Sequence, residues 1–273
     1  MEDKSKKKLD KLRKVIKAKG SLVVAFSGGV DSSLIAKVAY DELGDKAIAV
    51  TIESDTLSHR EFEIAKRVAG EIGISHEVVK LSELNNEDFV KNPVDRCYHC
   101  KKEEMDVMKD VASRKNFSSI AFGVNVSDFG EFRPGIKALR EENFFEPLVE
   151  AEIGKEEISA IAESLGLSNY DLPSTTCLAS RIPYGETITK SKLERIEKGE
   201  SFLLDLGIRQ VRVRNYNDIA RIEVDDDQIE SVVKNRAEIF DKFRDIGFVY
   251  VSLDLKGYRS GSMNEVLGDE DIE

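Results

Sequence analysis

Several residue types are scarce or missing from this sequence. It has no tryptophan, five prolines and three cysteines among 273 residues. Three cysteines are an odd number and too few to staple a small secreted fold, so we expect free thiols that serve chemistry or metal binding. No apolar run approaches the roughly 18–20 residues that a membrane-spanning helix needs. The Lys-rich stretch 1–20 contains no apolar signal region, and we therefore expect a cytoplasmic protein with no membrane partner.

Positive charge is in the minority. Lys and Arg number 41 against 52 Asp and Glu, which gives a formal net charge of -11 at pH 7. Such a polyanion is a poor partner for DNA, RNA or an anionic membrane. One local exception is the segment 4–19, where nine basic residues accompany an apolar stripe at helical spacing. We interpret it as a solvated amphipathic helix, and contact with RNA or polyphosphate is the alternative.

What the sequence does contain is an alternation of apolar runs and helical patterns. Hydrophobic residues make up 41% of the chain, enough for a core in one large domain or two smaller ones. Apolar runs predict buried strands at 21–26, 47–52, 77–81 and 119–124. Helical patterns lie between them, and one opens at Ser58 with Glu61 in capping-box spacing. The predicted fold class is α/β, a mostly parallel sheet with helices on both faces.

The pattern changes after residue 170. Residues 171–187 combine Pro, Gly, Ser and Thr with little periodicity, which is typical of a long functional loop. Beyond it, the sequence predicts a helix at 189–206, strands at 211–214 and 220–224, a helix at 228–243 and a strand at 248–253. We therefore divide the chain into a first domain at 1–172, a loop at 173–188 and a small α+β domain at 189–273, whose acidic end from Gly268 is expected to fray.

A glycine-containing motif joins the first strand of the predicted sheet to the helix that follows. It reads Ser27-Gly28-Gly29-Val30-Asp31-Ser32-Ser33. Glycines allow close backbone approach, the backbone N–H groups and the helix N-terminus attract anions, and the serines add donors. A carboxylate repels phosphate unless a cation intervenes, so Asp31 indicates Mg²⁺ or a hydrogen bond that shapes the loop. A Gly-Gly turn with a Ser/Asp helix cap is the alternative.

This motif resembles the PP-loop of enzymes that split ATP between the α and β phosphates and so adenylate a carbonyl or carboxylate oxygen. Asparagine, GMP and NAD synthetases and several tRNA sulfur transferases belong to that group. The motif is neither GxxxxGK[ST] nor GxGxxG. By itself it does not choose among the activities of the group.

The three cysteines form a pair and a distant third. Cys97 and Cys100 have C-x₂-C spacing, and Cys177 lies in the long loop. A redox dithiol or half of a zinc site would use such a pair. A Cys₄ zinc site within one chain is excluded, whereas a zinc ligand at His59 or His76 stays open. Three thiolates also suit an iron–sulfur cluster with one open iron, and three unrelated buried cysteines are the alternative.

The segment 173–185, PSTTCLASRIPYG, closely resembles the signature loop of the LarE-type ATP-dependent sulfur transferases. The resemblance runs from about residue 10 to about residue 255 and includes 123–128 with Arg133-Pro134-Gly135, and 212–214 with 220–223. It implies an enzyme that uses ATP and Mg²⁺ to adenylate a carboxylate of pyridinium biscarboxylate mononucleotide and to convert it to a thiocarboxylate. That reaction serves the synthesis of the nickel-pincer nucleotide of lactate racemase.

The resemblance also implies a role for each cysteine. In single-cysteine members, the cysteine that matches Cys177 attacks the acyl adenylate, gives up its sulfur and becomes dehydroalanine. Another branch adds a C-x₂-C pair, and there three cysteines are thought to hold a 4Fe–4S cluster that transfers sulfide catalytically. Because it contains Cys97 and Cys100, this sequence resembles the cluster branch, with all three cysteines as metal ligands. The nearby Arg181 is expected to lower the pKa of Cys177.

Nucleotide-binding residues follow from the motif and from strand ends. The resemblance implies that the ATP pyrophosphate and its metal are held by Ser27, Gly28, Gly29, Asp31, Ser32 and Ser33. Thr51 and Ser54 end the second predicted strand, and Gly123 and Asn125 end the fourth, at the edge where open α/β sheets bind ligands. These four are candidates for contact with the adenosine, and ordinary strand-end turns are the alternative.

Charged residues of the C-terminal part are candidates for substrate binding. Arg181, Arg212 and Arg214 can hold a phosphate or carboxylates bidentately, and Glu200 and Glu223 can bind a metal or balance that charge. The alternative for Arg212 and Arg214 is the solvated face of a strand, and for Glu200 a solvated helix. The first domain would then bind ATP, the loop would carry the chemistry, and the last domain would bind substrate or form oligomers.

We therefore predict an ATP-dependent sulfur transferase with a small-molecule nucleotide substrate, a possible sulfide donor and a homo-oligomeric state. A tRNA thiolase with the same loop is the first rival, disfavoured by the net charge of -11 and by the absence of an extra zinc-finger cysteine set. A non-catalytic ATP- or cluster-binding carrier is the second. An amide-forming synthetase, whose activity would survive loss of Cys177, is the third.

Overall fold

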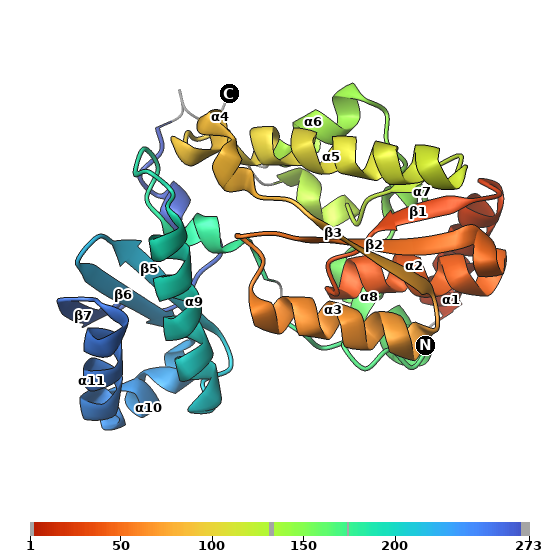
Figure 1. The fold of residues 1–273 in the computed structure, drawn as a ribbon. Helices are drawn as coiled ribbons and strands as arrows, with labels where there is room; N and C mark the ends of the chain where they lie inside the picture. Colours follow the sequence, from red (N-terminus) through yellow and green to blue (C-terminus); the bar gives the residue numbers. More distant parts are fainter. Residues whose placement is uncertain (1–2, 131–133, 174, 269–273) are drawn as a thin grey trace. The chain divides into compact units, whose positions relative to one another are not determined.

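Two sheets organise this computed structural model, which describes residues 3–130, 134–173 and 175–268. A four-stranded sheet belongs to the unit Met1–Leu81 with Cys97–Thr175, and a three-stranded sheet to the unit Ser82–Arg96 with Thr176–Glu273 (Figure 1). The segment Ser82–Arg96, which the sequence assigns to the first domain, thus packs with the second unit. Independent domains at 1–172 and 189–273 stay a prediction. Arg133, Ser174 and the chain end after Gly268 lie outside the described residues.

The first sheet is parallel throughout. Its strands are β1 (Leu22–Ala25), β2 (Ala47–Glu53), β3 (Ser75–Lys80) and β4 (Ile120–Ala121), in the order β3-β2-β1-β4. Phe145 adds an isolated parallel bridge to Ala121. The predicted parallel sheet is confirmed, but β4 is shorter than the predicted 119–124, because Gly123 and Asn125 leave the sheet and approach the loop after β1.

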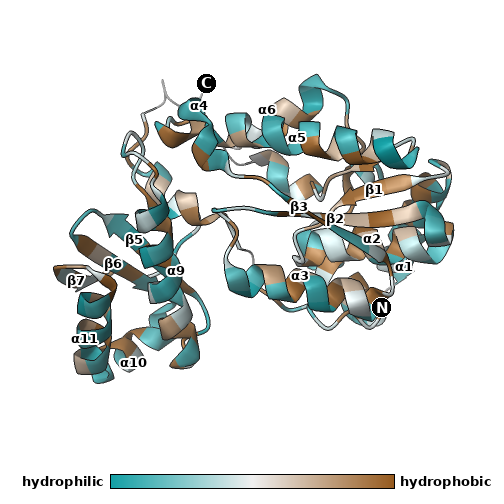
Figure 2. Ribbon diagram, viewed as in Figure 1, coloured by the Kyte–Doolittle hydropathy of each residue, from teal (hydrophilic) through white to brown (hydrophobic). Residues whose placement is uncertain are grey.

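Alternate side chains of β1 point to opposite faces of this sheet. Leu22 and Val24 pack with apolar residues of four helices, α1 (Asp3–Lys17), α2 (Val30–Leu43), α3 (His59–Ile72) and α8 (Lys155–Ser164). Val23 packs on the other face with α5 (Arg96–Lys115) and α6 (Pro134–Glu141). Figure 2 shows apolar residues, in brown, along β1 and β2. The predicted α/β class with helices on both faces is confirmed.

Local sequence sets the ends of α3. The hydroxyl of Ser58 accepts from the N–H of Glu61 at 3.2 Å, and the Glu61 carboxylate accepts from the N–H of Ser58 at 3.2 Å. This is the capping box that the sequence predicts. The helix ends at Gly73, whose φ of 81° favours glycine. Two short helices, α4 (Glu87–Val90) and α7 (Pro147–Glu150), have no counterpart among the predicted elements.

The second unit is a small α+β fold. In its sheet, β5 (Val211–Tyr216) pairs antiparallel with β6 (Ile219–Val224), and β6 pairs parallel with β7 (Tyr250–Leu253). Its first long helix, α9 (Lys190–Asp205), begins after Thr189, whose hydroxyl accepts from the N–H of Lys192 at 3.3 Å. Val211 and Val213 point into an apolar core with Leu203 and Phe243. Charged side chains occupy the opposite face of the sheet and belong to the site described below.

The prediction of a single helix at 228–243 is wrong. Two helices, α10 (Ile229–Lys234) and α11 (Arg236–Ile246), are separated by Asn235. The side-chain amide of Asn235 donates to the carbonyl of Ser231 at 2.9 Å. The same carbonyl also accepts from the backbone N–H of Asn235 at 3.1 Å. Asparagine has a low helix propensity because its side chain bonds to nearby backbone groups, and the break between the two helices lies at this residue.

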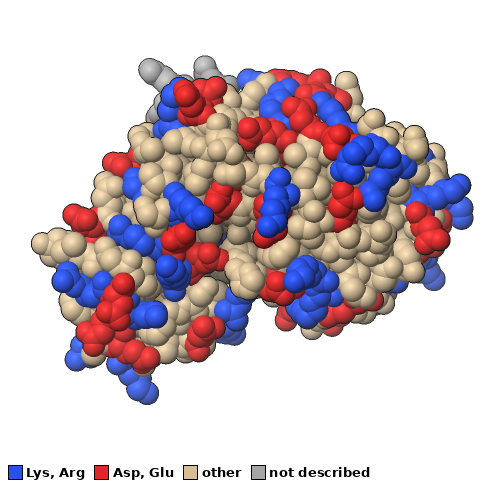
Figure 3. Space-filling view, in the orientation of Figure 1, with Lys and Arg blue, Asp and Glu red and all other residues tan. Residues whose placement is uncertain are grey.

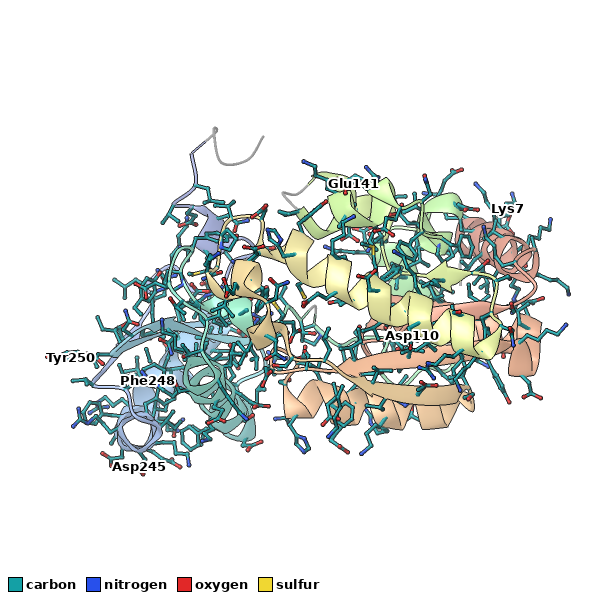
Figure 4. The ribbon with its side chains drawn as sticks, turned by 45° about the horizontal axis from the view of Figure 1, so that its top comes forward. Lys7, Asp110, Glu141, Asp245, Phe248 and Tyr250 are labelled. Carbon is teal, nitrogen blue, oxygen red and sulfur yellow. The ribbon has the colours of Figure 1, made fainter. Side chains whose placement is uncertain are left out.

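The basic helix α1 is partly neutralised by acidic residues of its own unit. Lys8 pairs with Glu157, and Lys17 pairs with Glu42. Lys7 projects outward from α1 in Figure 4. Figure 3 shows basic and acidic residues interspersed over the face that it draws. This pairing favours the interpretation of 4–19 as an amphipathic helix over that of a nucleic-acid contact. Within the described ranges, no helix is both long and apolar enough to cross a bilayer.

Candidate active site

The loop between β1 and α2 has a conformation that requires glycine. Gly28 has a φ of 76°, and a Cβ there would lie 2.7 Å from the backbone N and Cα of Ala65 in α3. Both the left-handed φ and the close approach of α3 exclude a side chain. Gly29 directly precedes the first turn of α2, whose N–H groups and dipole attract anions.

Serine hydroxyls brace this loop. Ser27 Oγ accepts from the N–H of Gly29 at 3.3 Å and lies 3.2 Å from Ser32 Oγ. Ser32 Oγ donates to the carbonyl of Gly29 at 3.1 Å. Because Ser32 is buried and Ser27 is exposed, Ser32 shapes the turn, whereas Ser27 can reach a ligand.

A residue far along the chain completes the loop, and the sequence gives no sign of it. Asn169, fully buried after α8, donates through Nδ2 to the carbonyl of Gly28 at 2.8 Å and to Ser33 Oγ at 2.9 Å. The Gly28 carbonyl fixes the amide orientation, since only the NH₂ end can donate to it. Ser33 is fully buried as well, so this bond makes it, like Ser32, a residue that shapes the loop.

Asp31 and Asn125 are predicted separately from the sequence and meet in the structure. Asn125 Nδ2 donates to Asp31 Oδ2 at 2.7 Å, and the N–H of Asn125 donates to Asp128 Oδ2 at 3.0 Å. Gly123 lies against the same loop, and a Cβ there would be 3.4 Å from the backbone N of Ser32. A carboxylate suits Mg²⁺, and the neighbouring N–H and hydroxyl donors suit phosphate. The residues present therefore fit a magnesium-bound nucleotide phosphate.

The two residues predicted at the end of β2 differ in environment. Thr51 is buried, and its hydroxyl donates to the carbonyl of Phe26 at 2.7 Å. The Nε2 atom of His76 lies 2.8 Å from the hydroxyl oxygen of Thr51. Thr51 thereby ties β1, β2 and β3 together. Burial, followed by the nearby Lys66, lowers the pKa of His76 and favours its neutral ring. Ser54 is half-buried beyond the strand end. Contact of either residue with adenosine stays a prediction.

Cys97 and Cys100 lie near the start of α5, three residues apart and on one side of the helix. Both are half-buried, and Cys100 Sγ donates to Glu104 Oε1 at 3.5 Å. Lys101 pairs with the same glutamate. Burial acts to lower the pKa of Lys101, but Glu104 and then Cys100 outweigh it and raise that pKa. A persistent ammonium group thus lies beside the two thiols.

The third thiol, Cys177, belongs to the other unit and directly precedes the short 3-10 helix Leu178–Arg181. Three cysteine sulfurs are suitable ligands for an iron–sulfur cluster. Over residues 3–130, 134–173 and 175–268, no group of three or more His, Cys, Asp and Glu side chains is arranged to hold a metal ion. A cluster at these three cysteines therefore stays a prediction, which rests on the chemistry of the thiols.

Arg181 anchors the backbone around Cys177. Its Nη1 donates to the carbonyls of Thr176 at 2.6 Å and of Cys177 at 3.0 Å. Its Nε and Nη2 donate to the two carboxylate oxygens of Glu200 at 2.9 and 3.0 Å. Glu200 is only 9% exposed, so the solvated-helix interpretation of this residue is wrong. The expected effect of Arg181 on the pKa of Cys177 stays a prediction.

Arg212 and Arg214 lie on the charged face of β5. They are 6% and 5% exposed, so the interpretation as a solvated strand face is wrong. Arg214 Nη2 donates to the fully buried carboxylate of Glu223 at 2.6 Å, and the hydroxyl of Ser262, which sequence reasoning missed, donates to it at 2.9 Å. Burial, followed by the charge of Arg181, lowers the pKa of Arg212. Grouped guanidinium groups of this kind suit phosphates and carboxylates.

Known proteins resemble this chain over most of its length. The family model described as Asparagine synthase matches residues 10–115, which include the phosphate loop and the C-x₂-C pair. The chain is 44% identical over 262 residues to the uncharacterized protein slr1717 of Synechocystis sp., covering 95% of this chain and 98% of that protein. It is 32% identical over 257 residues to the uncharacterized protein MJ0830 of Methanocaldococcus jannaschii, covering 93% and 98%.

A further relative has a name that states its product. The chain is 36% identical over 247 residues to the pyridinium-3,5-bisthiocarboxylic acid mononucleotide synthase of Lactiplantibacillus plantarum. The match covers 90% of this chain and 90% of that protein, so it extends through both units and both cysteine-bearing segments.

Proposed function

Because this chain belongs to the family of LarE-type PP-loop ATP-dependent sulfur transferases, we propose that it converts a carboxylate of pyridinium-3,5-biscarboxylic acid mononucleotide to a thiocarboxylate. The name of the Lactiplantibacillus plantarum relative supports this substrate. The observation that carries the proposal is the anchoring of the Cys177 backbone by the buried Arg181–Glu200 pair. It presents a sulfur on a braced loop of a chain that also contains a phosphate-binding loop. The product would serve the synthesis of a nickel-pincer nucleotide.

The first chemical step is adenylation. A carboxylate oxygen of the substrate attacks the α-phosphorus of ATP, pyrophosphate leaves, and an acyl adenylate forms. We assign the pyrophosphate to the N–H groups that follow Gly28 and to the hydroxyl of Ser27, while the buried Ser33 helps to hold the loop in shape. Magnesium bound at Asp31 would supply positive charge for that leaving group. Asn125 orients the carboxylate of Asp31 for this task.

The second step transfers sulfur. A thiolate or sulfide attacks the acyl carbon, the C–S bond forms, and AMP leaves with the electrons of the broken C–O bond. Arg181 and Glu200 hold the backbone at Cys177, and we assign the phosphate or carboxylates of the substrate to Arg212 and Arg214. The guanidinium group of Arg181 near Arg212 favours this assignment, because neighbouring guanidinium groups attract phosphates and carboxylates.

The transferred sulfur could reach the substrate by either of two routes. We propose that Cys97, Cys100 and Cys177 ligate a 4Fe–4S cluster, which when bound would supply sulfide and spare the protein. In the other route, the Cys177 thiolate forms a thioester, its Cα–H is lost to a base, and the Cβ–S bond breaks. The sulfur then stays on the substrate, and Cys177 becomes dehydroalanine.

Anaerobic reconstitution with iron and sulfide separates these routes. We expect a broad visible absorption band and bound iron in the wild type, both lost in Cys97→Ala, and an unchanged intact mass after turnover. A colourless wild type whose mass falls by the elements of H₂S after turnover would instead assign the sulfur to Cys177.

Release of AMP and pyrophosphate, measured with and without the mononucleotide, tests the proposed function. We expect both products only with the mononucleotide present, and neither from Asp31→Asn. No release with this or other acyl acceptors would favour a carrier protein. Activity retained in Cys177→Ala with an amine acceptor would favour an amide-forming synthetase. Salt-sensitive retention of tRNA would favour a tRNA thiolase.

We also infer that the protein forms homo-oligomers through its second unit and receives sulfide from a separate donor. Exposed apolar side chains on this unit support the first inference, among them Tyr250, which is 64% exposed and projects outward from β7 in Figure 4. Light scattering of the purified protein, compared with Tyr250→Ser, measures the assembly.

A further inference from the structure

Asn92 has an environment that its place between α4 and α5 does not explain. It lies two residues after α4, is fully buried, and has a φ of 54°. A non-glycine residue rarely adopts this left-handed conformation unless its surroundings fix it. The surroundings of Asn92 are the second half of the loop that carries Cys177.

The side-chain amide of Asn92 binds three carbonyl groups of that loop. Nδ2 donates to the carbonyl of Pro183 at 2.7 Å, of Glu186 at 3.1 Å and of Ile182 at 3.3 Å. The backbone adds a further bond, because the N–H of Gly185 donates to the carbonyl of Asn92 at 2.9 Å. One asparagine therefore fixes residues 182–186 by side chain and main chain together.

Arg96 fixes the orientation of this amide. Its Nη1 donates to Asn92 Oδ1 at 3.0 Å, and its guanidinium lies 4.7 Å from the centre of the Tyr184 ring. The Tyr184 hydroxyl donates to Asn264 at 2.9 Å. A flip of the Asn92 amide would place NH₂ against Arg96 and oxygen against three carbonyls, so the arrangement is fixed.

The loop is thus held on both sides of its 3-10 helix. Arg181 holds the part around Cys177, through the carbonyls of Thr176 and Cys177. Asn92 holds the part that follows Arg181, and it does so without a contact to the assigned reacting atoms. Catalytic geometry that shifts by about 1 Å can lose about a hundredfold in rate, so a second anchor matters for a nucleophile on a loop.

We propose that Asn92 is a positioning residue for the sulfur-transfer step, and that its side-chain bonds to residues 182–186 set the place of Cys177. This inference rests on the proposed function only where thiocarboxylate formation is measured. The competing explanation is that asparagine is present only because it tolerates a positive φ. Glycine tolerates that φ better still but lacks the side chain, which makes Asn92→Gly the decisive variant.

The test compares wild type, Asn92→Gly and a matched control, Asn86→Ala. Asn86 lies on the same segment and caps α4 by accepting from the N–H groups of Asp88 and Phe89 at 3.0 and 3.2 Å, away from the loop. Three quantities are measured: substrate-dependent ATP–pyrophosphate exchange, thiocarboxylate formation, and the alkylation rate of Cys177 relative to Cys100 by peptide mass spectrometry. Exchange does not need Cys177, so it reports adenylation alone.

For Asn92→Gly we expect exchange within about twofold of wild type, and thiocarboxylate formation slower by about tenfold to a hundredfold. We also expect alkylation of Cys177, but not of Cys100, to change by several-fold. For Asn86→Ala we expect lower thermal stability, with unchanged exchange, unchanged thiocarboxylate formation and an unchanged alkylation ratio. Asn92→Asp should resemble Asn92→Gly, because a carboxylate keeps Arg96 but cannot donate to the loop.

The proposal is overturned if Asn92→Gly transfers sulfur and alkylates at Cys177 like the wild type. It is also overturned if exchange and transfer fall together by the same factor, which is the signature of general unfolding. A wild type that forms no thiocarboxylate would contradict the proposed function, whereas the alkylation ratio would still decide the role of Asn92.

Discussion

Asn125 donates to the carboxylate of Asp31 across 2.7 Å, although 94 residues separate them in the chain. The bond connects the segment that follows β4 to the first turn of α2. It also orients the carboxylate that we assign to Mg²⁺. Asn125 would thus act on a bound Mg²⁺ through its ligand, an arrangement that commonly tunes metal affinity.

Removal of this partner should weaken magnesium binding more than adenylation itself. For Asn125→Ala, we expect the magnesium concentration at half-maximal ATP–pyrophosphate exchange to rise by about tenfold, the lower end of what loss of an outer-shell partner costs. At saturating magnesium, exchange should recover most of its rate. An unchanged magnesium dependence would contradict the assignment of Asp31 as a ligand.

Gly28→Ala should disable the phosphate loop. The left-handed backbone costs about 1–2 kcal/mol with a side chain, and the added Cβ would also lie 2.7 Å from the backbone of Ala65. Gly20→Ala is the matched control, because Gly20 has a φ of 73° and a Cβ there would meet no described atom within 4 Å. Urea unfolding should show a larger loss for Gly28→Ala, and only this variant should lose nucleotide binding. Equal losses would refute the close approach of α3.

Asn169 and Ser33 should behave as a coupled pair. Asn169→Ala leaves the buried carbonyl of Gly28 without its donor, which costs about 1–3 kcal/mol. In a double-mutant cycle with Ser33→Ala, we expect a coupling of about 1 kcal/mol in the free energy of unfolding. ATP affinity, measured by calorimetry, should fall in both single variants. Strict additivity of the two substitutions would show that the 2.9 Å contact contributes nothing.

Disruption of the Arg181–Glu200 pair should strongly destabilise the folded protein. Glu200→Gln leaves a buried guanidinium without its charge partner, and we expect a loss of about 3–5 kcal/mol in the free energy of unfolding. The exposed pair Arg209–Asp227, whose side chains are 75% and 63% exposed, supplies the control. Asp227→Asn should change stability by less than about 1 kcal/mol. Similar unfolding curves for the two variants would contradict the buried geometry.

Acidification should destabilise the protein partly through His76. Burial lowers the pKa of this residue in the folded state, so the unfolded chain, with a pKa of about 6.5, binds more protons as the pH falls. Stability from this group is therefore present above the unfolded pKa and is lost below it. The melting temperature of the wild type should drop more than that of His76→Gln between about pH 7.5 and pH 5.5. Equal drops in the melting temperature of the two proteins would show that His76 does not contribute to the loss of stability in acid.

Local sequence determines most of the first unit, and distant contacts determine most of the site. The apolar runs around Val23 and Val50 are long and unbroken, so strand formation and parallel packing follow from burial alone. Ser58 with Glu61 is likewise a local signal. Asn169 and Asn92 have no such signal, because each bonds to atoms more than 85 residues away in the chain.

Burial of charge is the other property that spacing does not reveal. Arg212 and Arg214 have the i, i+2 pattern of a solvated strand face, but the segment around Ser262 supplies a partner to the Arg214–Glu223 pair. The sequence does not reveal the break between α10 and α11 for a different reason. The apolar spacing continues through Asn235, so it does not show a break, which lies at a residue whose amide bonds to the carbonyl of Ser231.

Sulfur transfer itself is the central claim, and mass spectrometry of the mononucleotide tests it most directly. The protein, reconstituted anaerobically with iron and sulfide, is incubated with the mononucleotide, ATP and magnesium. We expect a product in which sulfur replaces one carboxylate oxygen, formed together with AMP and pyrophosphate. We also expect that Cys177→Ala still releases pyrophosphate but forms none of this product. An unaltered mononucleotide with the wild type, or the same thiocarboxylate yield from Cys177→Ala, would contradict the proposed sulfur transfer.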